Sequence, residues 1–310
     1  MRYLNIIAVT AAGILLSTIS IAAATPEGRG FPSADAAAKA LIDAAKSDDV
    51  TALIDILGPA SQEILTTSDA VADQQIRKNF AARASAKMKL VPNTHVPKAK
   101  TLVVGKEEWP LPIPIVQLDG KWYFDVEQGK QEILARRIGG NELDAIEVCR
   151  GYVEAQNDYA EVDRTRSGVP HYANKIVSSP GKRDGLYWAS DRNEDSPIGA
   201  IVAKAFAEGY TKRNEPYHGY YFKVLTAQGP HASGAAMSYL QDGLMTKGFA
   251  LIAWPSDYGS TGIMTFLVNK TGIVYQKDLG AKTSEIAGAY TAYDPDEAWT
   301  PVSTSTSARK

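Results

Sequence analysis

The sequence predicts an α+β protein made of two successive units. In the first unit, three stretches with helical spacing of apolar residues precede several strand-like segments, which indicates N-terminal helices plus a curved antiparallel sheet. In the second unit, a long helical pattern precedes four short strand patterns with Gly-containing turns. That order is typical of a helix packed on a four-stranded antiparallel meander. We expect the units to cover residues 25–138 and 141–302, and we expect residues 303–310 to form a disordered tail because they hold no large apolar residue.

The first 24 residues predict a secretory signal peptide. Arg2 gives a positive start, residues 6–21 are apolar or small, and Ala22-Ala23-Ala24 offers a small-residue cleavage site. The apolar run is shorter than the roughly 20 residues that a spanning helix needs. We therefore expect cleavage near Thr25, a periplasmic or secreted protein, and no stable membrane insertion. An uncleaved anchor is the alternative.

Three helices are expected at the start of the first unit. Ser33 is a suitable N-cap for the first helix, and Asp48 or Asp49 for the second. Gly58-Pro59 should end the second helix, because proline cannot continue it. A third pattern of apolar residues runs over residues 76–88.

The period of the apolar residues then changes to that of strands. Strand patterns cover residues 101–104, 113–118 and 121–126, and Asp119-Gly120 predicts a tight hairpin between the last two. Helices followed by a hairpin with the sequence DGKWYF resemble the cone domains of the nuclear-transport-factor-2-like superfamily, over about residues 31–128. The resemblance implies an apolar pocket and, in some members, an Asp/His pair. The only histidine in this segment, His95, is expected to be a solvated loop residue.

Residues 128–137 also have a helical pattern, which we expect Gly139-Gly140 to break. Asn141 should then cap a second helix over residues 142–160. We place the domain boundary at the glycine pair.

Cys149 is the only cysteine, so the chain has no internal disulfide. It shares a helical face with Ile146 and Val153, and we expect a buried apolar residue here rather than a nucleophile.

The second unit continues with a helical pattern and four strand patterns. Its order of elements and the hairpin sequence GIMTFLVNKTGIVY resemble the globular heads of type IV pilins and pseudopilins, over about residues 141–280. In the loop that would hold calcium in some such heads, Arg164 and Arg166 stand where carboxylates are needed, so we assign no metal. The helical pattern covers residues 198–208, and the strand patterns cover residues 219–227, 247–254, 262–269 and 273–277.

Nearly the whole chain is similar to the bacterial exported-protein family catalogued as domain of unknown function 2950. The similarity lies in segments such as FPSADAAAKALIDAA, EEWPLPIPIV, NELDAIEVCRGYVEAQNDYA and SPGKRDGLYW. It implies an exported protein and no established activity.

The chain carries no recognisable catalytic motif. HExxH, GxSxG, P-loop and CxxC patterns are absent from the sequence, and its four histidines lack metal-ligand spacing, so we assign no catalytic residue and no cofactor. A net charge of −2 gives no reason to expect a nucleic-acid partner. Ser256-Asp257 and His218 lie at neighbouring predicted strand ends, as serine hydrolysis would require. Because turns favour Ser, Asp and Gly, we interpret them as turn residues.

Charged and aromatic loop residues of the second unit are the candidate binding site. We favour a non-enzymatic protein that binds an unknown envelope protein or surface polymer through these loops. The alternatives are an envelope hydrolase with a site at the domain interface and a small-ligand carrier that uses the N-terminal pocket. The candidate contacts are Arg183, Asp184, Tyr187, Trp188, Tyr217 and Tyr258.

Overall fold

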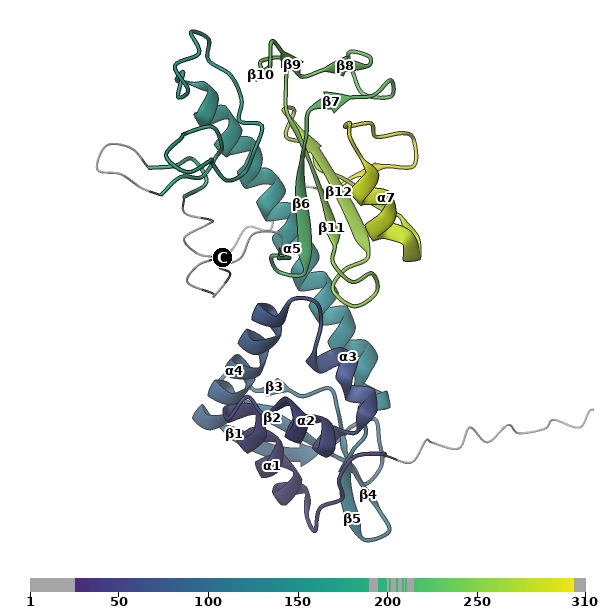
Figure 1. Ribbon diagram of the computed structural model, residues 1–310. Helices are drawn as coiled ribbons and strands as arrows, with labels where there is room; N and C mark the ends of the chain where they lie inside the picture. Colours follow the sequence, from purple (N-terminus) through teal and green to yellow (C-terminus); the bar gives the residue numbers. More distant parts are fainter. Residues whose placement is uncertain are drawn as a thin grey trace, which may run out of the picture.

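The computed structural model describes residues 26–189, 195–199, 201, 205, 208, 210 and 215–303. The predicted signal peptide lies outside these residues, as do residues 304–310 of the predicted tail. The protein has the expected α+β architecture, with two groups of helices and strands arranged along one long helix (Figure 1). No helix in the described part of the chain is both long and apolar enough to span a bilayer.

The first group begins with helices, as predicted. The side chain of Ser33 accepts a hydrogen bond from the Ala36 amide (3.1 Å), and Asp49 caps the second helix through the Ala52 amide (2.9 Å). Gly58 ends the second helix in a left-handed conformation (φ +93°). The helices are α1 (Ala34–Lys46), α2 (Val50–Leu57), the one-turn α3 (Gln62–Leu65) after the 3₁₀ turn η1 (Pro59–Ser61), and α4 (Ala70–Ala86).

An antiparallel sheet with the order β1-β2-β4-β5 follows, and β3 pairs with β2. The expected hairpin at Asp119-Gly120 is confirmed, and both residues have positive φ (+49° and +77°), as a type I′ turn requires. Residue 88 was expected in a helix, but α4 ends at Ala86 and Met88 pairs with Val104. The strands are β1 (Met88–Pro92), β2 (Lys100–Val104), β3 (Trp109–Pro110), β4 (Ile115–Leu118) and β5 (Lys121–Phe124).

The long helix α5 (Val126–Ala160) has 35 residues and is about 52 Å long. The expected break at Gly139-Gly140 is wrong, because the helix continues through both glycines. The residues after the pair are held by the second group. Asn141 donates to the carbonyl of Thr261 (2.8 Å), and the carboxylate of Glu142 accepts from two amides at the start of β12 (both 3.0 Å). These contacts offset the cost of about 1 kcal/mol for each glycine in a helix.

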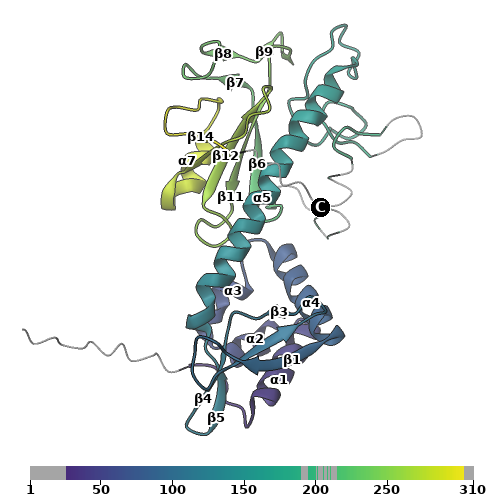
Figure 2. The same cartoon turned by 180° about the vertical axis from the view of Figure 1, so that it is seen from behind.

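The predicted four-stranded meander of the second group is confirmed. Strands β6, β11, β12 and β13 pair antiparallel in this order, and β14 extends the sheet next to β13. Helix α5 packs on β11 and β12 (Figure 2), and α7 packs on β11. These elements are β6 (Tyr220–Leu225), β11 (Ala250–Pro255), β12 (Met264–Asn269), β13 (Tyr275–Asp278), α7 (Thr283–Ala289) after the 3₁₀ turn η2 (Gly280–Lys282), and β14 (Thr300–Pro301).

Two short hairpin-like pairs lie at the far end of this sheet (Figure 1). They are β7 (Ala227–Gln228) with β8 (Met237–Ser238), and β9 (Leu240–Gln241) with β10 (Leu244–Met245). The helix expected over residues 198–208 is described in part, and the residues described at 199, 201, 205 and 208 are helical.

The described residues form two hydrophobic cores. The first is built from buried residues between Phe31 and Val126, and the second from buried residues between Ala145 and Trp299. Cys149 is fully buried in the second core, as expected, and burial raises the pKa of its thiol to about 12. The division into separable domains at the glycine pair stays a prediction.

Candidate functional site

The six candidate binding residues do not form one surface. Tyr187 and Tyr217 line a groove of about 1000 Å³ between α5, the 174–177 segment and the β6–β11 face of the sheet. Trp254 also lines this groove, and its indole N–H has no hydrogen-bond partner within the described residues. Of the six candidate binding residues, the structure therefore brings Tyr187 and Tyr217 together in this groove.

Three of the other candidates have structural roles in the loop before β6. Trp188 is only 6% exposed and belongs to the second core, and the guanidinium of Arg183 lies 5.4 Å from the centre of its ring. Asp184 accepts hydrogen bonds from Lys175 (2.6 Å) and from the amide of Ser179 (2.7 Å). Burial acts to raise the pKa of Asp184, but these hydrogen bonds outweigh burial and lower the pKa to about 2. Asp184 thus stabilises the loop in which it lies.

Tyr258 lies in the turn between β11 and β12, outside the residues that line the groove. Its hydroxyl donates to the carboxylate of Asp278 (3.2 Å). Its side chain is exposed, but the structure does not place it beside Tyr187 or Tyr217 in one cavity.

The two groups meet at a polar junction that the sequence analysis did not find. The amide and hydroxyl of Ser68 bind the carboxylate of Asp257 (2.9 Å) and the hydroxyl of Ser256 (2.8 Å). Next to them, the buried carboxylate of Asp69 caps α4 and accepts from the hydroxyl of Tyr210 (2.9 Å) and the amide of Gly219 (2.8 Å). Ser256-Asp257 therefore joins the two groups.

His218 lies beside this junction, between two carboxylates. Its Nδ1 is 2.5 Å from Asp144 and its Nε2 is 2.8 Å from Glu208, and its ring stacks on Tyr217 at 4.2 Å. Burial alone lowers the pKa of His218, but the hydrogen bonds with Asp144 and Glu208 outweigh it and the pKa is raised. Both ring nitrogens donate in the charged form, so neither is left to take a proton from Ser256. The residues considered for serine hydrolysis do not form a catalytic triad here.

The charge on His218 predicts a dependence of stability on pH. Because the pKa of His218 in the folded protein lies above the ordinary value of 6.5, its ion pairs contribute fully to stability below pH 6.5. This contribution to stability is lost as the pH rises through the raised pKa. We expect His218→Gln to lower the melting temperature most at about pH 5 and least at about pH 9. The variant His95→Gln, in an exposed loop, should show no such trend, and a difference independent of pH would contradict the ion-pair role.

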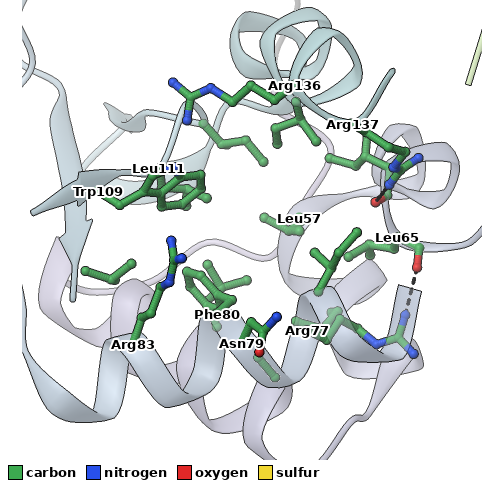
Figure 3. A pocket seen from close by; sticks show the side chains of 18 residues that line it. Leu57, Leu65, Arg77, Asn79, Phe80, Arg83, Trp109, Leu111, Arg136 and Arg137 are labelled. Carbon is green, nitrogen blue, oxygen red and sulfur yellow. Dashed lines mark hydrogen bonds between the residues drawn. The ribbon is translucent and has the colours of Figure 1, made fainter. Parts of the chain in front are cut away.

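A pocket of about 410 Å³ lies inside the first group (Figure 3). Helices α1, α2, α3 and α4, strand β2, the 109–113 segment and residues 133–137 of α5 surround it. No Asp or Glu is among its described lining residues, and it has four arginines. Its apolar walls include Leu41, Leu53, Leu57, Ile64, Phe80, Val104, Trp109, Leu111 and Ile133, and the arginines are Arg77, Arg83, Arg136 and Arg137.

Two of these arginines are bound to the protein itself. Arg77 contacts the carboxylate of Asp48 (2.6 Å) and the carbonyl of Leu65 (2.8 Å). Arg137 donates to the carbonyl oxygens of Glu63 (3.1 Å) and Ile64. Burial lowers the pKa of Arg137. The pKa of an arginine nevertheless stays far above neutral pH, so the guanidinium remains charged. These two cations hold the α3 segment against α4 and α5.

The other two arginines make fewer hydrogen bonds to the protein. Arg136 uses its Nε for Glu132 (2.7 Å), and its guanidinium lies 5.3 Å from the ring centre of Trp109. The exposed side chain of Arg83 makes no hydrogen bond or ion pair within the described residues. Figure 3 shows Arg83 reaching from α4 toward the cavity on the side of Trp109 and Leu111. No group of His, Cys, Asp or Glu suited to a metal ion occurs in the described part of the chain.

The fold and the sites define a two-core α+β protein with a ligand-sized apolar pocket in its first core. The chain belongs to the family described as Protein of unknown function (DUF2950), whose model matches residues 28–302. No curated protein and no solved structure matches the chain. The likenesses to nuclear-transport-factor-2-like domains and to pilin heads are therefore not confirmed.

Proposed function

We propose that this protein is an exported, non-enzymatic carrier that binds a small apolar or amphipathic molecule in the pocket of its first core. The observation that supports this most is a 410 Å³ cavity with apolar walls and no carboxylate among its described lining residues. Ligand pockets typically measure about 300–1,000 Å³ and have mostly apolar walls with few polar groups. This is the alternative of a small-ligand carrier, and the pocket favours it over a hydrolase.

Burial of apolar ligand surface would supply the affinity. Each Å² of apolar area removed from water contributes about 25 cal/mol. The aromatic rings of Phe80 and Trp109 and the aliphatic side chains of α1 and α2 offer such a surface. An acid–base pair, which a hydrolase would need, is missing from the described lining.

A larger side chain inside the pocket should weaken binding of an apolar ligand. Ala45 is 3% exposed and lines the cavity from α1, so Ala45→Leu places additional carbon atoms in the space that the ligand needs. We expect displacement assays with a fluorescent apolar probe to show at least a roughly tenfold loss of affinity, without a lower melting temperature. Ala40→Leu makes the same change on the same helix outside the pocket and should bind the probe normally. Equal binding by both variants would exclude the pocket as the site.

The groove of the second group supports a second candidate function, binding of an envelope protein or surface polymer. The supporting observation is that Tyr187 and Tyr217 line one groove of about 1000 Å³. Tyr187→Ala should weaken capture of a crosslinked envelope partner, because it removes aromatic contact area from the groove. Tyr258→Ala, outside the groove, serves as the control. Unchanged crosslinking in Tyr187→Ala would reject this function.

A further inference from the structure

We propose that the ligand of the first-core pocket is a single-chain amphiphile with an anionic head group, a carboxylate or a phosphate monoester. This inference rests on the proposed carrier function and adds the chemical class of the ligand. The acyl or alkyl chain would occupy the apolar cavity, and Arg83 and Arg136 would bind the head group.

The charges of the described lining residues all have one sign. Four arginines and no acidic residue line the pocket, so the local potential favours an anion over a cation. Arg77 is paired with Asp48, and the two terminal nitrogens of Arg137 donate to backbone carbonyls of the α3 segment, whereas its buried Nε has no partner within the described residues. Arg136 is also paired through its Nε, with Glu132, so Arg83 is the lining arginine that makes no ion pair within the described residues.

Arg83 comes from α4 and Arg136 from α5, and Figure 3 shows them below and above the side chains of Trp109 and Leu111. Arg83 makes no hydrogen bond or ion pair within the described residues, and the terminal nitrogens of Arg136 make no hydrogen bond to them. A guanidinium offers up to five N–H donors in a planar fork that matches the oxygens of a carboxylate or phosphate. Both arginines therefore have donors available for an anionic head group.

The exposure of these two side chains sets the orientation of the ligand. Arg83 is exposed and the side chain of Arg136 is 41% exposed, whereas Leu41, Leu53 and Leu57 are buried. A charged head group at the arginine side keeps contact with water, which avoids the high cost of burying a charge. The apolar chain then lies among the leucines. This polarity fits an amphiphile with one charged end.

The test uses the purified protein and displacement of a fluorescent apolar probe. The competitors are dodecanoate, dodecyl phosphate, dodecanol and dodecyltrimethylammonium, which share a chain and differ in the head group. We expect the tighter of the two anions to compete at least roughly tenfold better than dodecanol, because a hydrogen bond to a charged group contributes that much to affinity. The cation should compete worst. The better anion identifies the head group as carboxylate or phosphate.

Variants of α4 test the role of Arg83. R83Q should weaken binding of the preferred anion by about tenfold and leave dodecanol unchanged, and R83K should restore part of the loss. K78Q removes a cation from the same helix outside the pocket and should change neither affinity. Equal competition by anion and alcohol, or an unchanged anion affinity in R83Q, would overturn the head-group assignment while the carrier function stands. If none of the competitors displaces the probe, the carrier function itself fails.

Discussion

Asp69→Ala should lower the free energy of unfolding by about 3 to 5 kcal/mol, although Asp69 lies outside every pocket described here. The residue is 2% exposed, and its carboxylate accepts from the amides of Ala72 and Gly219 and from the hydroxyl of Tyr210. Loss of the helix cap costs about 1 kcal/mol. The unsatisfied amide and hydroxyl add roughly 1–3 kcal/mol each.

Asp49→Ala is the matched control for this prediction. Asp49 caps α2 in the same way, through the amide of Ala52, but its bond is exposed and joins no second element. We expect it to cost only about 1 kcal/mol. Urea denaturation followed by circular dichroism measures both losses. Equal losses would show that the contacts of Asp69 with Tyr210 and Gly219 contribute nothing to stability.

The second large effect is expected for Gln156→Leu, at roughly 3 kcal/mol of unfolding free energy. Gln156 is fully buried on α5, and its amide donates to the carbonyl of Ala173 (2.7 Å) and to the hydroxyl of Tyr152 (2.9 Å). Its carbonyl accepts from the amide of Ala173 (2.9 Å). Leucine has a similar volume but cannot form these bonds, so both backbone groups of Ala173 would be buried without partners.

Glu154→Leu provides the comparison, because it makes the same kind of change two residues away on the exposed face of α5. Surface substitutions of this kind change stability by about 0.5 kcal/mol or less. Thermal unfolding of both variants separates the hydrogen bonds of Gln156 from any general effect of leucine on the helix. A loss below about 1 kcal/mol for Gln156→Leu would mean that the loop around Ala173 is held by other contacts.

Local patterns predicted the elements whose signals are local. Ser33 and Asp49 lie at the helix starts expected from capping chemistry, and Asp119-Gly120 forms the expected hairpin. Short apolar runs bounded by Gly-containing turns located the four strands of the meander, of which β11 and β12 are buried along nearly their whole length. Cys149 is in the core as its neighbours on the helix indicated.

The wrong or missing predictions concern residues whose contacts lie far away in the sequence. Gly139-Gly140 has the local signal of a break, but Asn141 and Glu142 are held by residues about 120 positions away. Asp69 appears in the sequence as one more polar residue before a helix, and its partners lie 141 and 150 positions away. Single-residue patterns carry no information on such pairs.

The candidate site was predicted only as a general possibility. The resemblance to cone domains implied an apolar pocket, but no single residue of that pocket could be identified from the sequence. The signal in the sequence is the spacing of Arg77, Phe80 and Ala84, which places a cation on the face of the helix that packs on the core. Trp188 was a candidate contact, yet its indole lies in the core because a large ring gains more from burial than from a loop position.

The continuity of α5 has a mechanical consequence. Its early turns place Ile133 and Arg136 on the pocket wall, and near its other end the hydroxyl of Tyr159 holds the carbonyl of Arg183 (2.6 Å). Asn141, bound to Thr261, lies between these ends on a helix about 52 Å long, whose second half is buried in the second core. Because the helix is continuous and close-packed there, a displacement of its early turns by a molecule in the pocket would have to be accommodated by the packing of the second core.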